Sequence, residues 1–261
     1  MKRPDLPGAF LTAPIAHRAL HDVTQGRPEN SLSALGAAIA TCYGIEVDLQ
    51  LTADGQAVVF HDYELERLTG VPGTVREHTA AQLGEIALLH GDGETIPTLA
   101  QVLSKVAGRV PLLIELKDQD GAMGTDVGPL EQATATALAN YDGPVAVMSF
   151  NPHSMAEMAR LSGGIARGLI TSDYAQDDWP LRPEVCDHLR EIPDFDRVGA
   201  SFISHQARDL ARPRVAELRA AGVPVLCWTI RSPQAEEAAR AVAHNITFEG
   251  YAAAIPLPST G

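Results

Sequence analysis

Short apolar runs alternate along this chain with longer segments in which alanine and leucine recur at helical spacing. The apolar runs predict strands, and the Ala/Leu-rich segments predict amphipathic helices. We expect strands at residues 14–17, 44–51, 57–61, 110–117, 144–150, 166–171, 200–204, 223–230 and 245–248. We expect helices near residues 31–41, 98–106, 130–140, 152–161, 208–221 and 233–243. Strands followed by helices over the whole length predict a parallel sheet.

Several of the expected helices carry start or stop signals. Ser31 can cap the first helix, and Pro152 and Pro233 take first-turn positions, where proline is favoured. Gly222 follows another helical segment and is typical of a helix end.

The number of strand–helix units is close to eight, which favours an α/β fold of the (β/α)8 TIM barrel type. An open doubly wound sheet is the alternative, but no glycine-rich phosphate loop opens a first helix. Residues 65–98 are rich in Gly and Thr and break the rhythm, so we interpret them as a short inserted segment after the second strand. We expect a single domain over residues 1–261.

Charged residues interrupt strands that otherwise look buried. Glu46 and Asp48 share one face of a strand, as do Glu115 and Lys117, because alternate residues of a strand point the same way. We expect these side chains to point into the barrel near the C-terminal strand ends, where barrel active sites lie. Three carboxylates predict a site for a hard divalent cation, Mg²⁺ or Ca²⁺. Zinc is disfavoured because no His/Cys ligand spacing accompanies them, and simple surface charges are the alternative.

Two histidines and two cations lie close to these carboxylates in the predicted fold. His17 and His61 end strands and are candidates for a general acid and base, because histidine titrates near neutrality. Arg18 and Lys117 suit phosphate oxygens, although neutralising the buried carboxylates is a compatible role. Together these residues suggest metal-assisted cleavage of a phosphate ester.

Two aromatic residues fall near the same strand ends. Trp228 and Phe150 could form an apolar wall for a substrate, or could pack in the barrel core. The residues alone favour neither role.

The chain has a formal net charge of −13, which argues against binding to nucleic acid or anionic membranes. Cys42, Cys186 and Cys227 are too scattered for a disulfide framework. No stretch approaches the length of a membrane span or a signal peptide. We therefore expect a cytoplasmic protein without membrane insertion.

The polar motifs resemble those of the glycerophosphodiester phosphodiesterase family. They are His17-Arg18-Ala19, Pro28-Glu29-Asn30-Ser31, Glu46-Val47-Asp48, Thr52-Ala53-Asp54-Gly55, His61-Asp62, Ile114-Glu115-Leu116-Lys117, Ser149-Phe150-Asn151 and Trp228-Thr229. The resemblance covers nearly the whole chain and is densest over residues 14–70. The combined spacing is specific, although each motif alone is weak.

The resemblance implies a TIM barrel with a bound divalent metal ion, usually Mg²⁺ or Ca²⁺. It implies metal ligation by Glu46, Asp48 and Glu115, acid–base catalysis by His17 and His61, phosphate binding by Arg18 and Lys117, and an orienting role for Glu29. The implied reaction is hydrolysis of a small-molecule glycerophosphodiester to sn-glycerol 3-phosphate and an alcohol, through a cyclic phosphate. It leaves a homo-oligomer open.

Two departures from the family pattern affect the expected site. Ala19 stands where the family has glycine, so this turn must avoid a positive φ or accept strain. Residues 246–250 replace the usual Thr-Asp-x-Pro ending, which puts the contribution of the last strand in question.

Three other functions stay open at this point. One is a lysophospholipase D-type phosphodiesterase acting on lysophospholipids with the same site. Another is a different TIM-barrel enzyme, such as a lyase or isomerase that stabilises an enolate. The third is a catalytically silent ligand-binding relative.

Overall fold

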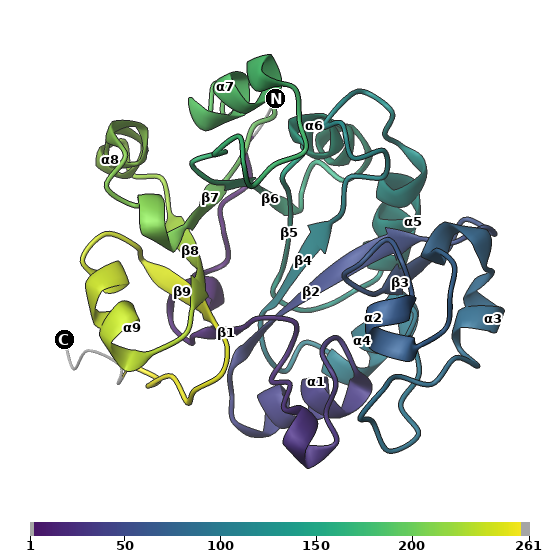
Figure 1. Cartoon of the computed structure of the whole chain (residues 1–261). Helices are drawn as coiled ribbons and strands as arrows, with labels where there is room; N and C mark the ends of the chain where they lie inside the picture. Colours follow the sequence, from purple (N-terminus) through teal and green to yellow (C-terminus); the bar gives the residue numbers. More distant parts are fainter. Residues whose placement is uncertain (1–2, 257–261) are drawn as a thin grey trace.

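Eight parallel strands close into a barrel in the computed structural model, which describes residues 3–256 (Figure 1). The barrel strands are β1 (Ile15–Ala16), β2 (Gly44–Leu51), β4 (Leu112–Leu116), β5 (Val145–Ser149), β6 (Ala166–Thr171), β7 (Phe202–Gln206), β8 (Val225–Ile230) and β9 (Asn245–Phe248). The short β1 pairs with β2 on one side and β9 on the other, which closes the ring. The predicted TIM barrel is confirmed.

One further strand lies outside the ring. β3 (Ala57–Val59) pairs antiparallel with the C-terminal half of β2, so Leu49 faces Val59 across the pair. This hairpin is followed by α2 (Glu66–Thr69), the 3₁₀ turn η3 (Val75–Glu77) and α3 (Ala80–Leu83). These elements form a small separate core with β3 at the side of the barrel (Figure 1).

An outer ring of helices surrounds the strands (Figure 1). It comprises α1 (Leu32–Ala40), α4 (Leu99–Val106), α5 (Pro129–Leu138), α6 (Pro152–Leu161), α7 (Pro183–Arg190), α8 (Pro213–Ala220) and α9 (Pro233–Arg240). The Ser31 hydroxyl accepts a hydrogen bond from the backbone N–H of Ala34, as its predicted capping role requires. Among the described residues, every helix falls short of the length and apolar character that crossing a membrane requires.

Three sequence predictions differ from the structure. α7 was not predicted, because only Cys186 and Leu189 of this polar helix are buried, too few to give a clear periodicity. α8 begins at Pro213 rather than at 208, since Ala207–Asp209 forms the 3₁₀ turn η4. The strand expected at 200–204 lies two residues later, at Phe202–Gln206.

The two faces of the strands feed different cores. Ile45, Val47 and Leu49 point outward and pack against the helices, as the alternation of β2 predicts. The barrel interior is filled in part by Phe202, and a side chain at Gly168 would place its Cβ 2.3 Å from that ring. The close approach explains the glycine.

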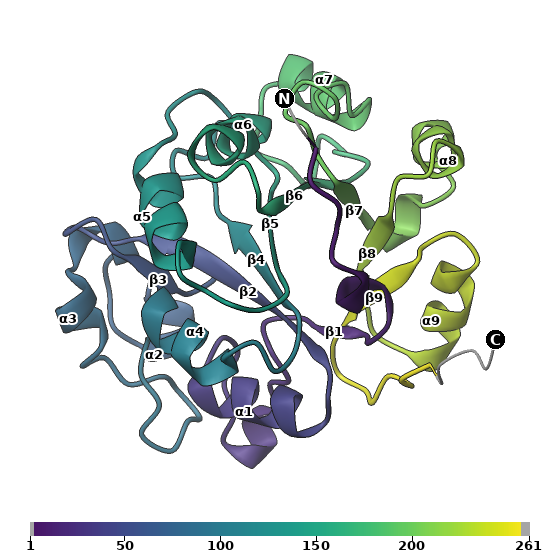
Figure 2. The same cartoon turned by 180° about the vertical axis from the view of Figure 1, so that it is seen from behind.

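The N-terminal segment covers the N-terminal end of the barrel, where Figure 2 shows it crossing in front of the strands. The segment contains the 3₁₀ turn η1 (Gly8–Leu11), whose Phe10 is fully buried. Asn245 of β9 donates hydrogen bonds of 2.7 Å to the carbonyls of Phe10 and Ala13. This end of the barrel is therefore closed, and the opposite end is left for the polar residues.

Candidate active site

Three carboxylates meet inside the barrel. Glu46 and Asp48 lie on β2, and Glu115 lies on β4 in direct register with Asp48. One oxygen from each residue lies within 4.8 Å of the others. All three residues are buried, with exposed fractions of 1%, 1% and 8%. The strand alternation thus brings together the three residues that the sequence predicted.

Their electrostatic balance is uneven. Burial, followed by the charges of Asp48 and Glu115, raises the pKa of Glu46 well above its usual value. Burial is also the largest single influence on Asp48, but the charges of Lys117, His61, Arg18 and His17 together outweigh it and hold the pKa of Asp48 well below its usual value. The Lys117 Nζ lies 2.9 Å from a Glu115 oxygen and 3.3 Å from an Asp48 oxygen. The negative charge of the three carboxylates is therefore only partly compensated by the chain itself.

This donor set fits a divalent cation such as Mg²⁺ or Ca²⁺. The oxygens are hard ligands, and bringing three of them together in the interior is costly unless a cation neutralises them. Asn30 donates a hydrogen bond of 3.0 Å to Asp48 and fixes the orientation of that carboxylate.

A strained turn places Arg18 beside the carboxylates. Its backbone N–H donates to a Glu46 oxygen at 2.9 Å, and its Nη1 donates to Glu29 at 2.9 Å. Its buried Nε lies 3.7 Å from an Asp48 oxygen and forms no hydrogen bond within residues 3–256. The φ angles of Arg18 and Ala19 are 52° and 64°, so the turn accepts strain where the family has glycine.

His17 follows β1 and pairs with a carboxylate from the other end of the chain. Its Nδ1 lies 2.5 Å from an oxygen of Glu249, the residue after β9. The second Glu249 oxygen accepts a hydrogen bond of 2.7 Å from Arg231. Burial lowers the pKa of His17, and the Glu249 hydrogen bond partly opposes that shift. Donation from Nδ1 leaves the lone pair on Nε2, which suits proton transfer.

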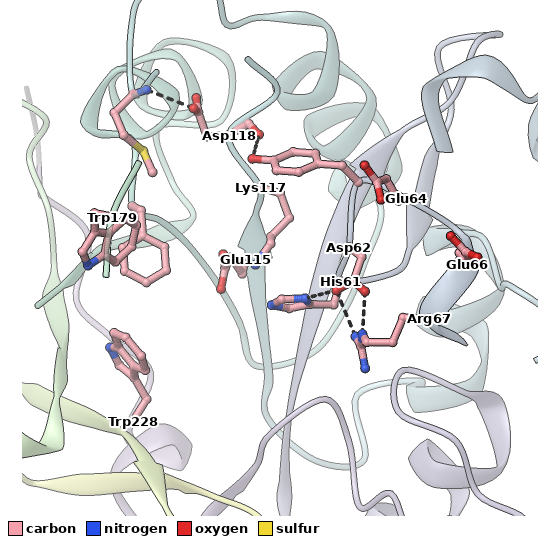
Figure 3. Close-up of a pocket in the computed structure, with 13 residues that line it drawn as sticks. His61, Asp62, Glu64, Glu66, Arg67, Glu115, Lys117, Asp118, Trp179 and Trp228 are labelled. Carbon is pink, nitrogen blue, oxygen red and sulfur yellow. Dashed lines mark hydrogen bonds and ion pairs between the residues drawn. The ribbon is translucent and has the colours of Figure 1, made fainter. Parts of the chain in front are cut away.

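His61 follows β3 and has a similar partner. Its Nδ1 lies 2.6 Å from an oxygen of Asp62, and Asp62 accepts a hydrogen bond of 2.5 Å from Arg67 (Figure 3). Arg67 also donates to both oxygens of Glu29, at 2.8 and 2.9 Å. Glu29 thus joins Arg67 to Arg18, which connects the surroundings of the two histidines.

Two adjoining cavities open at this end of the barrel. The smaller, of about 170 Å³, lies between the two histidines. Its walls include eight of the ten residues predicted for the site, namely His17, Arg18, Glu46, His61, Glu115, Lys117, Phe150 and Trp228. Asp48 and Glu29 do not line it, but both contact Arg18 from behind. The larger cavity, of about 820 Å³, shares part of this wall and extends to Trp179 (Figure 3).

Several residues of this arrangement were not predicted as site residues, among them Asp62, Glu249, Arg231 and Trp179. Asp62 could have been recognised, since it adjoins His61 in the sequence. Glu249 falls in the atypical ending, where no motif pointed to it, and Arg231 follows β8. Trp179 lies in an irregular segment that gives no periodic signal.

Comparisons with known protein sequences point to one family. A model of the glycerophosphoryl diester phosphodiesterase family matches residues 17–247. The glycerophosphodiester phosphodiesterase of Caldanaerobacter subterraneus subsp. tengcongensis is 29% identical over 179 residues, covering 65% of this chain and 71% of that protein. The enzyme of the same name from Bacillus altitudinis is 29% identical over 191 residues, covering 70% and 73%.

Solved structures give the same result. A phosphodiesterase of Oleispira antarctica in complex with the product sn-glycerol-3-phosphate superposes with a TM-score of 0.73 and 25% identity, covering 92% of this chain and 94% of that one. A glycerophosphodiester phosphodiesterase of Thermotoga maritima, at 19% identity and a TM-score of 0.69, covers 90% and 94% and shares the fold. Because the family model spans most of the chain, the protein belongs to the glycerophosphoryl diester phosphodiesterase family.

Proposed function

We propose that this enzyme hydrolyses glycerophosphodiesters to sn-glycerol 3-phosphate and an alcohol, with a divalent metal ion and two histidines. The observation that carries the proposal is the shared cavity. His17 and His61, each hydrogen-bonded to a carboxylate at Nδ1, line the same cavity as the acidic residues Glu46 and Glu115. Such a cavity can hold a phosphodiester with a proton-transfer group near each of its ester oxygens.

Two positively charged side chains, Arg18 and Lys117, bind the phosphate. Arg18 lines the smaller cavity and offers its guanidinium to a phosphoryl oxygen, and Lys117 adds a point charge. Glu29 is a positioning residue, because it holds the guanidinium of Arg18 through a hydrogen bond of 2.9 Å.

The histidines move the protons. One imidazole takes the proton of the glycerol 2-hydroxyl, whose oxygen attacks phosphorus, and the other protonates the departing alcohol. The P–O bond to the alcohol breaks as the new P–O bond forms, which gives a cyclic phosphate. The two roles then reverse as water opens the ring.

Glu46, Asp48 and Glu115 would hold the metal ion, for which Mg²⁺ and Ca²⁺ are the candidates. When bound, it acts as a Lewis acid that withdraws charge from the phosphoryl oxygens.

The glycerophosphate half of the substrate follows from the relatives. The Oleispira antarctica phosphodiesterase is described in complex with sn-glycerol-3-phosphate as its product. We place the enzyme in the cytoplasm, where its three free cysteines would stay reduced.

The test is an activity matrix of metal ions against substrates after chelation. We expect turnover of glycerophosphodiesters that is lost on chelation and restored by Mg²⁺ or Ca²⁺. A substrate that lacks the glycerol 2-hydroxyl should not be cleaved, and undiminished cleavage would exclude the cyclic route. Lysophosphatidylcholine as the better substrate would favour the lysophospholipase alternative.

A further inference from the structure

We infer that the larger cavity selects a leaving alcohol that carries a quaternary ammonium group, as choline does. This inference rests on the proposed function and names the substrate class that the sequence left open. The cavity has an aromatic wall and an acidic wall, and the catalytic residues lie between them (Figure 3).

The aromatic wall is built from rings in mutual contact. The Phe150 ring lies 4.9 Å from that of Trp179 and 5.5 Å from that of Trp228, measured between ring centroids. The buried Tyr174 supports it from behind, with its ring 4.9 Å from Trp179. Trp228 is fixed by a hydrogen bond from its indole N–H to the Ser204 carbonyl at 3.0 Å. Such a rigid wall attracts cations that are too weakly hydrated to need hydrogen bonds.

The opposite wall carries uncompensated negative charge. Glu64 and Glu66 are exposed residues of the segment after β3, and neither carboxylate forms an ion pair within residues 3–256. Asp118 accepts hydrogen bonds from Asn151 and from the backbone N–H of Met123, and within residues 3–256 it forms no ion pair.

The cations that line the cavity are already engaged. Arg67 pairs with Asp62 and Glu29, and Lys117 pairs with Glu115 and Asp48. The potential in the larger cavity is therefore negative on the side away from the metal-binding carboxylates. It favours a cationic group and disfavours an anionic one.

The position of the cavity assigns it to the leaving group. It shares His61, Glu115 and Lys117 with the smaller cavity, so a phosphodiester can extend from one cavity into the other. The smaller cavity, of about 170 Å³, suits the glycerophosphate half. An acyl chain fits the larger cavity less well, because covering the carboxylates of Glu64 and Glu66 with hydrocarbon would cost their hydration.

A pair of substrates isolates the charge of the head group. Glycerophosphocholine and the glycerophosphate ester of 3,3-dimethylbutanol have nearly the same shape, but only the first carries a positive charge. We expect kcat/KM to be about tenfold higher for the choline ester. A ratio within about twofold of unity would overturn the inference.

Substitutions then test the two walls separately. Trp179 lines the larger cavity and not the smaller one, so Trp179→Leu should lower the choline-to-dimethylbutyl ratio about three- to tenfold, whereas Trp179→Phe should keep most of it. The double variant Glu64→Gln/Glu66→Gln should also lower the ratio, and these exposed positions carry little risk for folding. Glu237→Gln removes one such charge from an exposed position on α9, outside the cavity, and should leave the ratio unchanged.

The outcomes separate this inference from the proposed function. Cleavage of both esters at equal rates would refute the cationic site and leave the phosphodiesterase assignment standing. Cleavage of neither ester with any metal would refute the assignment itself. If the wild-type preference exists but persists in the Trp179→Leu and double glutamine variants, other residues carry the selectivity and the cavity assignment is wrong.

Discussion

The two histidines have the same kind of partner, but the chain supplies these partners in very different ways. His61 contacts Asp62, its neighbour in the sequence, whereas His17 contacts Glu249, 232 residues away. In both pairs the carboxylate also accepts a hydrogen bond from an arginine, Arg67 or Arg231. The first pair is encoded locally, and the second exists only because β1 and β9 lie side by side in the closed barrel.

The His17 pair shows how a chain that departs from the family's motif can still place a carboxylate beside this histidine. The atypical ending of this chain lacks the Thr-Asp-x-Pro pattern, yet Glu249 brings a carboxylate to His17 from the same strand end. Hydrogen bonding with His17 keeps the pKa of Glu249 well below its usual value, so this carboxylate stays ionised. Two equivalent pairs would be expected if each histidine acts in turn as acid and as base.

The largest effect should come from removing either imidazole. His17→Ala and His61→Ala should each lower kcat by roughly 10²–10⁴-fold, because each removes one proton-transfer group. Circular dichroism should show an intact fold in both variants. Losses below about tenfold in both would refute the catalytic roles of the histidines.

Removing the carboxylate partners should cost less and should affect both pairs alike. Glu249→Gln and Asp62→Asn should each lower kcat by about 10–100-fold, a part of the acid–base contribution, since the imidazole stays but loses its ionised partner. Steady-state kinetics with KM determined separately would measure this. A normal kcat in Glu249→Gln beside a strong loss in Asp62→Asn would mean that the two pairs are not equivalent.

The pKa of His17 reports directly on its contact with Glu249. Because burial lowers the pKa of His17, NMR titration of the metal-free protein should place it below 6.5. Glu249→Gln should lower this pKa further, since the carboxylate opposes the shift.

The same shift affects stability. At pH values between the pKa of His17 in the folded protein and 6.5, the unfolded state binds more protons than the folded state. The free energy of unfolding therefore decreases as the pH falls through this range. A His17 pKa that rises in Glu249→Gln would contradict the assigned contact.

The smallest effect concerns the turn beside His17. Ala19 has a φ of 64°, and relief of this strain should let Ala19→Gly raise the free energy of unfolding by about 0.5–1 kcal/mol. His61 has no positive-φ residue beside it, so its pair offers no equivalent substitution. Urea denaturation would measure the change, with Ala37→Gly in the helix α1 as a control that should destabilise.

Much of the fold and site could be predicted because regular elements impose their own periodicity. The alternation of a strand places Glu46 and Asp48 on one face, and strand neighbourhood brings Glu115 beside them. Glu249 could not be placed in this way, since its contact depends on how the barrel closes. Trp179 lies in an irregular segment, where spacing says nothing about direction.

Because β1 pairs with β9 beside His17, catalytic activity should depend on the barrel staying closed at this pair of strands. His17 donates its backbone N–H to the Phe248 carbonyl at 2.9 Å, directly beside the ion pair with Glu249. Local separation of β1 from β9 would move Glu249 away from the His17 imidazole, while the helices on the opposite side of the barrel keep their contacts. The enzyme would then lose activity under milder conditions than those that unfold the whole barrel.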